Sequence, residues 1–215
     1  MEIPEQQKVQ ILSELAETKR MLAGIENLAR DTPFCCMVTS AASGEGKTTL
    51  TSSLGMIAAK HANKSILAID MNWHSPGLHR CFGLVPEWDL KRYSQDNNMK
   101  ALIRPSGLEN LDILTAPAPN GHDGGFNTEN PGLAQSILKQ AHESYDFILV
   151  DTAAVFPPNR CMIDPAILGN VSNAVILVVL TGVTPRQQVK RARIILEGSC
   201  GKMAGVVVNH WKNRL

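Results

Sequence analysis

The sequence has no excess of charge of either sign and no long hydrophobic run. Its 21 lysine and arginine residues nearly balance 20 aspartate and glutamate residues, and the formal net charge is +1. A chain so balanced lacks the overall positive field that recruits nucleic acid or an anionic membrane. The longest apolar run, AVILVVL at 174–180, is far shorter than a membrane span, and the polar first ten residues are unlike a signal peptide. These absences predict a cytoplasmic protein whose partner is not nucleic acid.

Cysteine and tyrosine are also scarce. The five cysteines are odd in number and scattered, without the C-x-x-C or Cys/His spacing of a zinc site or a disulfide framework. They are therefore expected to be reduced thiols, mostly buried in the core. The chain has two tyrosines, Tyr93 and Tyr145.

Short apolar runs are abundant, and they alternate with segments of helical pattern. The runs are continuous rather than alternating, which is typical of strands covered on both faces. They lie at 34–40, 65–70, 111–116, 146–151, 173–180 and 203–209, with helical patterns at about 47–62, 131–143, 161–169 and 185–199. This order predicts an α/β fold with a doubly wound, mostly parallel sheet.

The first residues carry a different pattern. Apolar side chains at Val9, Leu12, Leu15, Leu22 and Ile25 have helical spacing, with charged residues between them. They predict an amphipathic helix over roughly 5–29, which either packs on its own domain or docks a neighbouring subunit. We expect residues 1–32 to form this helix and a linker, and 33–215 to form one α/β domain. Residues 81–130, rich in proline, glycine and asparagine, are the least regular part.

A glycine-rich turn follows the first predicted strand. The segment TSAASGEGKTT, residues 39–49, has the residue types of a phosphate-binding loop, with Ala41 at the usual first glycine. Backbone N–H groups at the start of the next helix would hold phosphate, provided that Ala41 takes a negative φ. Lys47 would bridge the β- and γ-phosphates, and Thr48 would place its hydroxyl on Mg²⁺. The expected ligand-binding residues of this turn are Ser43, Gly44, Glu45, Gly46, Lys47, Thr48 and Thr49.

Two carboxylates end apolar strands. Asp70 follows SILAI and Asp151 follows DFILV. The carboxyl ends of strands in an open α/β sheet border the crevice where ligands bind. Carboxylates there are suited to Mg²⁺, so Asp70 and Asp151 are predicted metal ligands beside Thr48, and catalytic residues beside Lys47.

Taken together, these motifs resemble the ParA/MinD superfamily of deviant P-loop ATPases, and within it the bacterial tyrosine kinases of capsule and exopolysaccharide assembly. VTSAASGEGKTT resembles their Walker A motif, ILAIDMNWHSPGLHRCFGL their Walker A′ motif, and YDFILVDTAAV their Walker B motif. LENLDILTAPAPN is similar to a strand and proline-rich turn of the kinases. The resemblance implies a P-loop NTPase fold, ATP or ADP and Mg²⁺ as ligands, and a place near adenine for Asn209 in GVVVNHW.

The sequence departs from the kinase pattern at several positions. Walker A′ normally has a second Asp and then an Arg, where this chain has Asn72 and His74. An amide offers an oxygen to metal-bound water but does not accept a proton from an attacking hydroxyl. The family's tyrosine-rich tail has no counterpart here, and its oligomerisation pattern is matched by Glu17 and Arg20 only. The role of His74, as substitute base or bystander, stays open.

The resemblance implies an Mg·ATP-binding protein of exopolysaccharide or capsule biosynthesis. It would hydrolyse ATP or transfer the γ-phosphate while it regulates a membrane-anchored polysaccharide co-polymerase at the inner face of the membrane. One alternative is a degenerate regulator that binds nucleotide with little turnover, and another is a partition or positioning ATPase. Ala42, where partition ATPases have lysine, counts against the last. A homo-oligomer is a further expectation.

Overall fold

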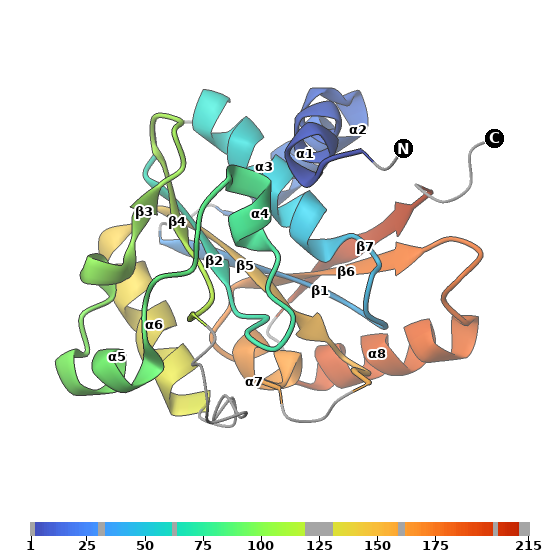
Figure 1. Cartoon of the computed structure of the whole chain (residues 1–215). Coiled ribbons are helices and arrows are strands. Elements are labelled where there is room, and N and C mark those ends of the chain that lie inside the picture. The colour runs from blue at the N-terminus through green and yellow to red at the C-terminus, as the bar shows by residue number, and fades with distance from the viewer. Residues whose placement is uncertain are drawn as a thin grey trace.

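A single seven-stranded sheet forms the centre of the molecule in the computed structural model (Figure 1), which describes residues 3–29, 33–61, 64–118, 131–158, 162–199 and 202–210. The strand order is β3-β4-β2-β5-β1-β6-β7. All neighbouring strands are parallel except β3 and β4, which are antiparallel. The strands are β1 (Phe34–Ser40), β2 (Ile66–Asp70), β3 (Arg104–Pro105), β4 (Leu111–Leu114), β5 (Phe147–Ala154), β6 (Ala174–Leu180) and β7 (Met203–Asn209).

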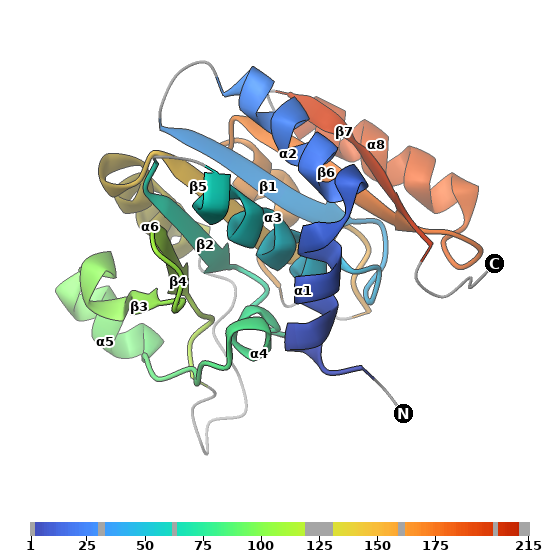
Figure 2. The same cartoon turned by 90° about the horizontal axis from the view of Figure 1, so that it is seen from above.

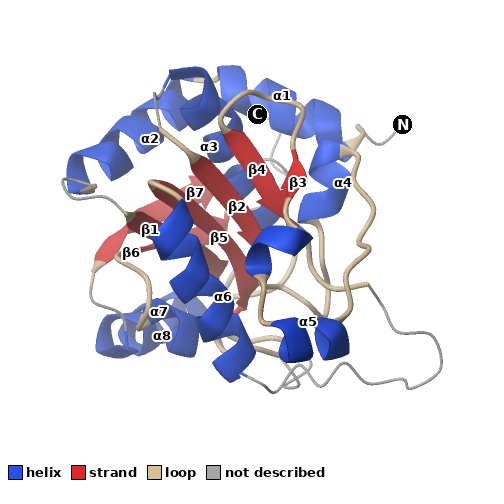
Figure 3. Ribbon diagram, turned by 90° about the vertical axis from the view of Figure 1, so that its left-hand side faces the viewer, coloured by secondary structure: helices blue, strands red, loops and turns tan. Residues whose placement is uncertain are grey.

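Helices cover both faces of this sheet (Figures 1 and 3). One face carries α1 (Glu5–Glu14), α2 (Ala16–Leu28), α3 (Lys47–His61) and α4 (Leu78–Phe82). The other carries α6 (Pro131–Ser144), α7 (Pro165–Gly169) and α8 (Arg186–Ser199), while α5 (Leu90–Asp96) and the 3₁₀ helix η1 (Met99–Leu102) lie toward the β3 edge. Consecutive β1 residues therefore enter different cores: Cys35 and Met37 belong to one, Cys36 and Val38 to the other. This explains why the strand sequences are continuously apolar.

The predicted doubly wound, mostly parallel sheet is confirmed, and the six predicted strands are present. The prediction missed β3, α4, α5 and η1, which lie in or directly before the irregular region 81–130. These elements are short, and β3 has only two residues, so local pattern carries little signal for them. Residues 119–130 lie outside the described part of the chain.

The N-terminal segment consists of two helices rather than the single predicted helix. The break is at Leu15, whose ψ of 137° is extended and whose exposed fraction is 43%. Val9 of α1 is fully buried, and Leu22 and Ile25 of α2 are 3% exposed, in a core shared with α3. The segment therefore packs on its own domain, as one of the two interpretations expected (Figure 2).

Helix α3 is covered by the sheet on one side and by α1 and α2 on the other (Figure 2). Its small polar side chains can be buried because their hydroxyls donate hydrogen bonds to main-chain carbonyls one turn earlier. Thr51 donates to Lys47, Ser52 to Thr48 and Ser53 to Thr49. Ser53 also lies 3.2 Å from the carbonyl oxygen of Val9 in α1. The helix that starts at the glycine-rich turn is thus held on both sides.

Among the described residues, no helix combines the length and apolar character needed to cross a membrane.

Candidate functional site

The glycine-rich turn joins β1 to α3 at the carboxyl edge of the sheet. Gly44 and Gly46 have φ values of 79° and 95°, the left-handed conformation that glycine adopts at no steric cost. Ala41 is not among the residues with positive φ, which meets the condition placed on it above. Its carbonyl accepts the N–H of Phe156 at 3.0 Å, so the turn is anchored to the segment after β5. Helix α3 begins at Lys47, and its first N–H groups face the turn, as an anion site requires.

Lys47 is buried beneath this turn, with an exposed fraction of 6%. Its ammonium donates to the Ser40 hydroxyl at 3.0 Å. Burial lowers the pKa of Lys47, while the carboxylates of Asp151, Glu45 and Asp70 act in the opposite direction. A buried ammonium among three carboxylates is ready to receive phosphate oxygens, because a charged ligand would replace the hydration that the lysine has lost.

Thr48 and Asp151 meet although they lie 103 positions apart. The Thr48 hydroxyl donates to Asp151 Oδ2 at 2.5 Å, and Asp151 is fully buried. Asp151 also pairs in register with Asp70 on the neighbouring strand β2. The structure thus brings together Lys47, Thr48, Asp70 and Asp151 at one point.

Asp70 organises the loop that follows β2. Its Oδ1 accepts the N–H of Asn72 at 3.0 Å, and its Oδ2 accepts those of Gly77 and Leu78 at 2.9 and 3.0 Å. A Cβ at Gly77 would lie 3.0 Å from Thr48 Cγ2, so glycine lets this loop approach the start of α3. Three backbone donors give the Asp70 carboxylate a structural role here, and its coordination of a metal stays a prediction.

Burial dominates the electrostatics of the two carboxylates. It raises the pKa of Asp70 to about 6, against the three backbone N–H groups, which lower it. The pKa of Asp151 is raised to about 7 by burial and then by the nearby Asp70, while Lys47 and Thr48 act in the opposite direction. Because two buried carboxylates repel each other when both are ionised, their arrangement favours binding of a cation between them.

The residues present fit a magnesium ion. Within the described part of the chain, Asp151 Oδ1 and Asn72 Oδ1 are buried oxygens without a hydrogen-bond partner, and such oxygens are the ligands Mg²⁺ prefers, directly or through water. No group of three or more His, Cys, Asp or Glu suited to a metal occurs among the described residues. A metal here would accordingly depend on Thr48, Asp151, water and ligand phosphates, the usual arrangement for Mg²⁺.

Asn72 and its neighbours differ from one another in exposure. The Asn72 amide donates to the carbonyl of Ser75 at 2.7 Å, and its exposed fraction is 9%. Trp73 is buried and donates from its indole nitrogen to the Asp70 carbonyl at 3.0 Å. Its ring meets that of Trp88 edge to face, with centroids 6.0 Å apart. His74, by contrast, is exposed.

Sequence reasoning missed how the turn is attached to β6 and β7. The carboxylate of Glu45 contacts Thr184, and the side-chain amide of Asn209 donates to the Glu45 carbonyl at 3.0 Å. A Cβ at Gly46 would lie 2.6 Å from Asn209 Nδ2, so the turn and the end of β7 are closely packed. Thr184-Pro185 had only the signature of a helix start, and nothing in the sequence pairs it with Glu45. The predicted place of Asn209 near adenine is untested by these contacts.

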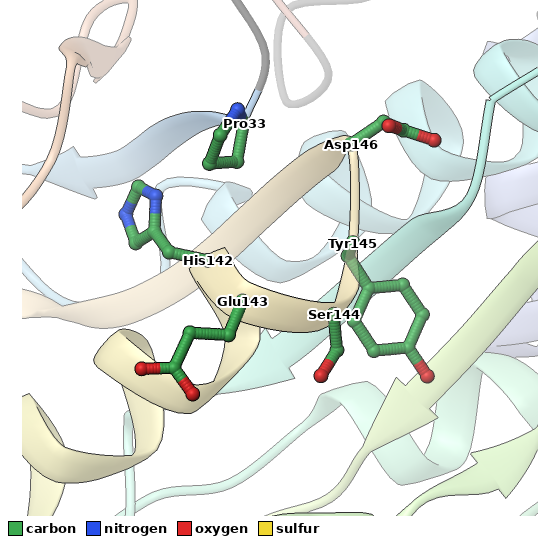
Figure 4. A pocket seen from close by; sticks show the side chains of 6 residues that line it. All are labelled: Pro33, His142, Glu143, Ser144, Tyr145 and Asp146. Carbon is green, nitrogen blue, oxygen red and sulfur yellow. The ribbon is translucent and has the colours of Figure 1, made fainter.

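Two surface hollows lie at opposite edges of the sheet. One of about 210 Å³ is lined by Pro33 and residues 142–146, including His142, Glu143 and Asp146 (Figure 4). It lies at the amino ends of β1 and β5, away from the glycine-rich turn. The other, of about 380 Å³, is lined by residues 154–157 and 162–165, directly after β5. The second adjoins the candidate site, since the Phe156 N–H is bound to Ala41.

Both tyrosines are engaged within the fold. The Tyr93 hydroxyl accepts a hydrogen bond from the Gln140 amide at 3.0 Å, and Tyr93 is 1% exposed. The Tyr145 hydroxyl donates to Asp112 Oδ2 at 2.7 Å, and burial together with Asp112 raises the pKa of Tyr145.

Of the cysteines, Cys35, Cys36 and Cys81 are buried free thiols, as expected, and the other two lie outside the described residues.

Comparison with known proteins agrees with this geometry. The model of the CobQ/CobB/MinD/ParA nucleotide binding domain matches residues 36–215. The chain is 31% identical over 181 residues to the tyrosine-protein kinase YwqD of Bacillus subtilis, covering 80% of this chain and 70% of that protein. It is 27% identical over 181 residues to CapB of Staphylococcus aureus, a putative tyrosine-protein kinase, with coverage of 80% and 73%.

Solved structures share the fold. The chimerical protein CapA2B2 superimposes with a TM-score of 0.74 at 22% identity, over 91% of this chain and 85% of that one. MinD from Pyrococcus horikoshii, complexed with Mg-ADP, gives a TM-score of 0.67 at 21% identity, over 84% and 72% of the two chains. With its fold, its turn and its relatives in agreement, the chain belongs to the bacterial tyrosine-kinase family within the CobQ/CobB/MinD/ParA nucleotide-binding domains.

Proposed function

We propose that this chain binds Mg·ATP at the glycine-rich turn and slowly removes the γ-phosphate. The observation that carries this is the convergence of Lys47, Thr48 and Asp151 beneath two left-handed glycines, with the Thr48 hydroxyl 2.5 Å from Asp151 Oδ2. In the proposed complex the N–H groups at the start of α3 hold the phosphates, and Lys47 bridges the β- and γ-phosphates. Thr48 and Asp151 would hold Mg²⁺, which would supply positive charge against the phosphate oxygens.

The lack of a second carboxylate in the loop after β2 favours slow over efficient chemistry. Asn72 takes the place where a base would accept the proton of an attacking hydroxyl, and its amide is committed to the carbonyl of Ser75. An amide has no useful proton affinity, and loss of a positioned base removes about 10²–10⁴-fold in rate. Since both tyrosines are hydrogen-bonded in the fold, we expect hydrolysis to exceed autophosphorylation.

A catalytically degenerate nucleotide-binding regulator is the second candidate, and the same amide supports it. In that case the chain responds to ATP or ADP by a change of shape or of oligomeric state, without turnover. A partition or positioning ATPase is a third candidate, supported by 31% identity over 122 residues to the septum site-determining protein MinD of Synechocystis, which covers 55% of this chain.

The wider setting is part of the proposal. We propose that the protein works in the cytoplasm, at the inner face of the membrane, as regulator of a membrane-anchored polysaccharide co-polymerase in exopolysaccharide or capsule biosynthesis. Its membership of the tyrosine-kinase family supports this setting. Homo-oligomer formation belongs to the same proposal.

The test follows the γ-phosphate of labelled Mg·ATP into free phosphate and into protein, with Lys47→Ala as the blank. We expect free phosphate above the blank and little label on tyrosine. Label on tyrosine would replace hydrolysis by kinase activity. Absence of turnover, with a change of tryptophan fluorescence on adding nucleotide, would favour the degenerate regulator. Absence of both would refute nucleotide binding.

A further inference from the structure

Glu45 is a carboxylate within the glycine-rich turn itself, yet it is 1% exposed. It lies between Gly44 and Gly46, the two residues with left-handed backbone. An anionic side chain in a turn that receives phosphate would repel the ligand if it pointed toward it. The structure instead places this carboxylate in a cluster of hydrogen-bond donors.

Three donors from two parts of the fold receive the carboxylate. Oε2 accepts the N–H of Ala42, within the turn, at 2.9 Å. Oε1 accepts the N–H of Leu180, at the end of β6, at 3.3 Å and the hydroxyl of Thr184, just before α8. The main-chain carbonyl of Glu45 accepts a hydrogen bond at 3.0 Å from the side-chain amide of Asn209, at the end of β7. One residue therefore joins the turn to the ends of two neighbouring strands (Figure 1).

We infer that Glu45, with Thr184, is a positioning residue that holds the glycine-rich turn in its phosphate-binding shape before nucleotide arrives. The inference rests on the proposed nucleotide binding at this turn and adds the device that orders it. A loop ordered in advance binds more tightly, since less conformational entropy is lost on association. The side chain itself need not touch the ligand.

The chemistry of the cluster makes an isosteric test possible. Two of the three donors, the N–H groups of Ala42 and Leu180, have no acceptor capacity. In Glu45→Gln the new –NH₂ group must face one of them, so at least one hydrogen bond is lost and two donors oppose each other. Thr184→Val removes only the hydroxyl, whereas Thr184→Ser keeps it.

The matched control is Asp112→Asn. It also removes a carboxylate that accepts a hydroxyl, that of Tyr145 at 2.7 Å, but from β4, on the far side of β2 and β5 from the turn. Each variant is first checked for folding by thermal unfolding without nucleotide, and its affinity for fluorescent N-methylanthraniloyl-ADP with Mg²⁺ is then measured.

We expect Glu45→Gln to weaken ADP binding about 10-fold or more, the equivalent of roughly one hydrogen bond to a charged group. Thr184→Val should weaken it by about 3- to 10-fold, Thr184→Ser should restore it, and the double variant should bind within about twofold of Glu45→Gln, because one hydrogen-bonded unit is lost. Asp112→Asn should bind as wild type does.

Wild-type affinity in folded Glu45→Gln and Thr184→Val proteins would overturn the positioning role while leaving nucleotide binding intact. An equal loss in Thr184→Ser and Thr184→Val would also overturn it, because the hydroxyl would then be irrelevant. If Glu45→Gln does not fold, the Thr184 pair decides alone. Failure of the wild-type chain to bind the probe would instead refute the nucleotide site, and the positioning role with it.

Discussion

Replacing Asn72 by aspartate would return a carboxylate to the site and test what the amide does. The Asn72 side chain is 9% exposed, its amide donates to the carbonyl of Ser75 at 2.7 Å, and its Oδ1 has no partner among the described residues. Asn72→Asp keeps the size of the side chain but loses the donor. It also adds a third carboxylate beside Asp70 and Asp151, both of which are fully buried.

Two contributions set the expected cost. Loss of the hydrogen bond to exposed Ser75 costs about 1 kcal/mol in the free energy of unfolding. The new carboxylate and its neighbours should raise one another's pKa by a total of about one to two units, which costs about 1.4–2.7 kcal/mol at neutral pH. Without Mg²⁺ the variant should therefore be less stable than wild type by about 2–4 kcal/mol.

Asn72→Ala separates these contributions, because it removes the same donor without adding charge. We expect Mg²⁺ to raise the unfolding temperature of Asn72→Asp more than that of Asn72→Ala or wild type. With an added tyrosine peptide and Mg·ATP, Asn72→Asp should transfer phosphate faster than wild type, by up to about 10²–10⁴-fold. Equal stability of the two variants without Mg²⁺, combined with no response to the ion, would refute the reasoning.

Three further predictions concern single groups of the site and its surroundings. Because burial raises the pKa of Asp151 to about 7 while the unfolded chain releases this proton near pH 4, the nucleotide-free protein should lose stability as pH rises between these values. Thermal melts should show that Asp151→Asn removes this part of the slope, and an unchanged slope would contradict the assignment. Thr48→Val should make ADP affinity almost insensitive to Mg²⁺ in titration calorimetry, whereas Thr48→Ser should retain the dependence. Tyr145→Phe, which loses the bond to Asp112, should lower the free energy of unfolding by about 1 kcal/mol in urea titrations. Phosphate release should be unaffected by that change, and a parallel loss would show that Tyr145 takes part in the reaction.

Much of the fold was predictable because its signals are local. Helix α3 was expected over 47–62 and is found at Lys47–His61, while β7 was predicted at 203–209 and found there. Continuous apolar runs, the turn glycines and Thr184-Pro185 before α8 are patterns that a short segment carries by itself. The N-terminal break at Leu15 was missed because the apolar spacing runs through it unchanged.

The residues of the candidate site could also be predicted from local patterns, but their hydrogen-bond partners could not. Lys47 and Thr48 begin α3 and Asp70 ends β2, whereas β5 continues past Asp151 to Ala154. Parallel strands still place all four residues near one edge of the sheet. The hydrogen bond from Thr48 to Asp151, for example, spans 103 positions. The burial of Trp73, which lies in a polar loop sequence, was likewise a consequence of packing against Trp88.

The sequence by itself determined the class of fold, the glycine-rich turn and the amide at position 72 in place of a second carboxylate, since each follows from residue type and spacing. Only the tertiary structure decided that the Asp70 carboxylate accepts hydrogen bonds from backbone N–H groups. It also decided that Glu45 accepts one from Thr184, 139 positions away. The physical reason is that a hydrogen bond depends on which strands become neighbours. That order is chosen by burial of the whole apolar sheet rather than by any short segment.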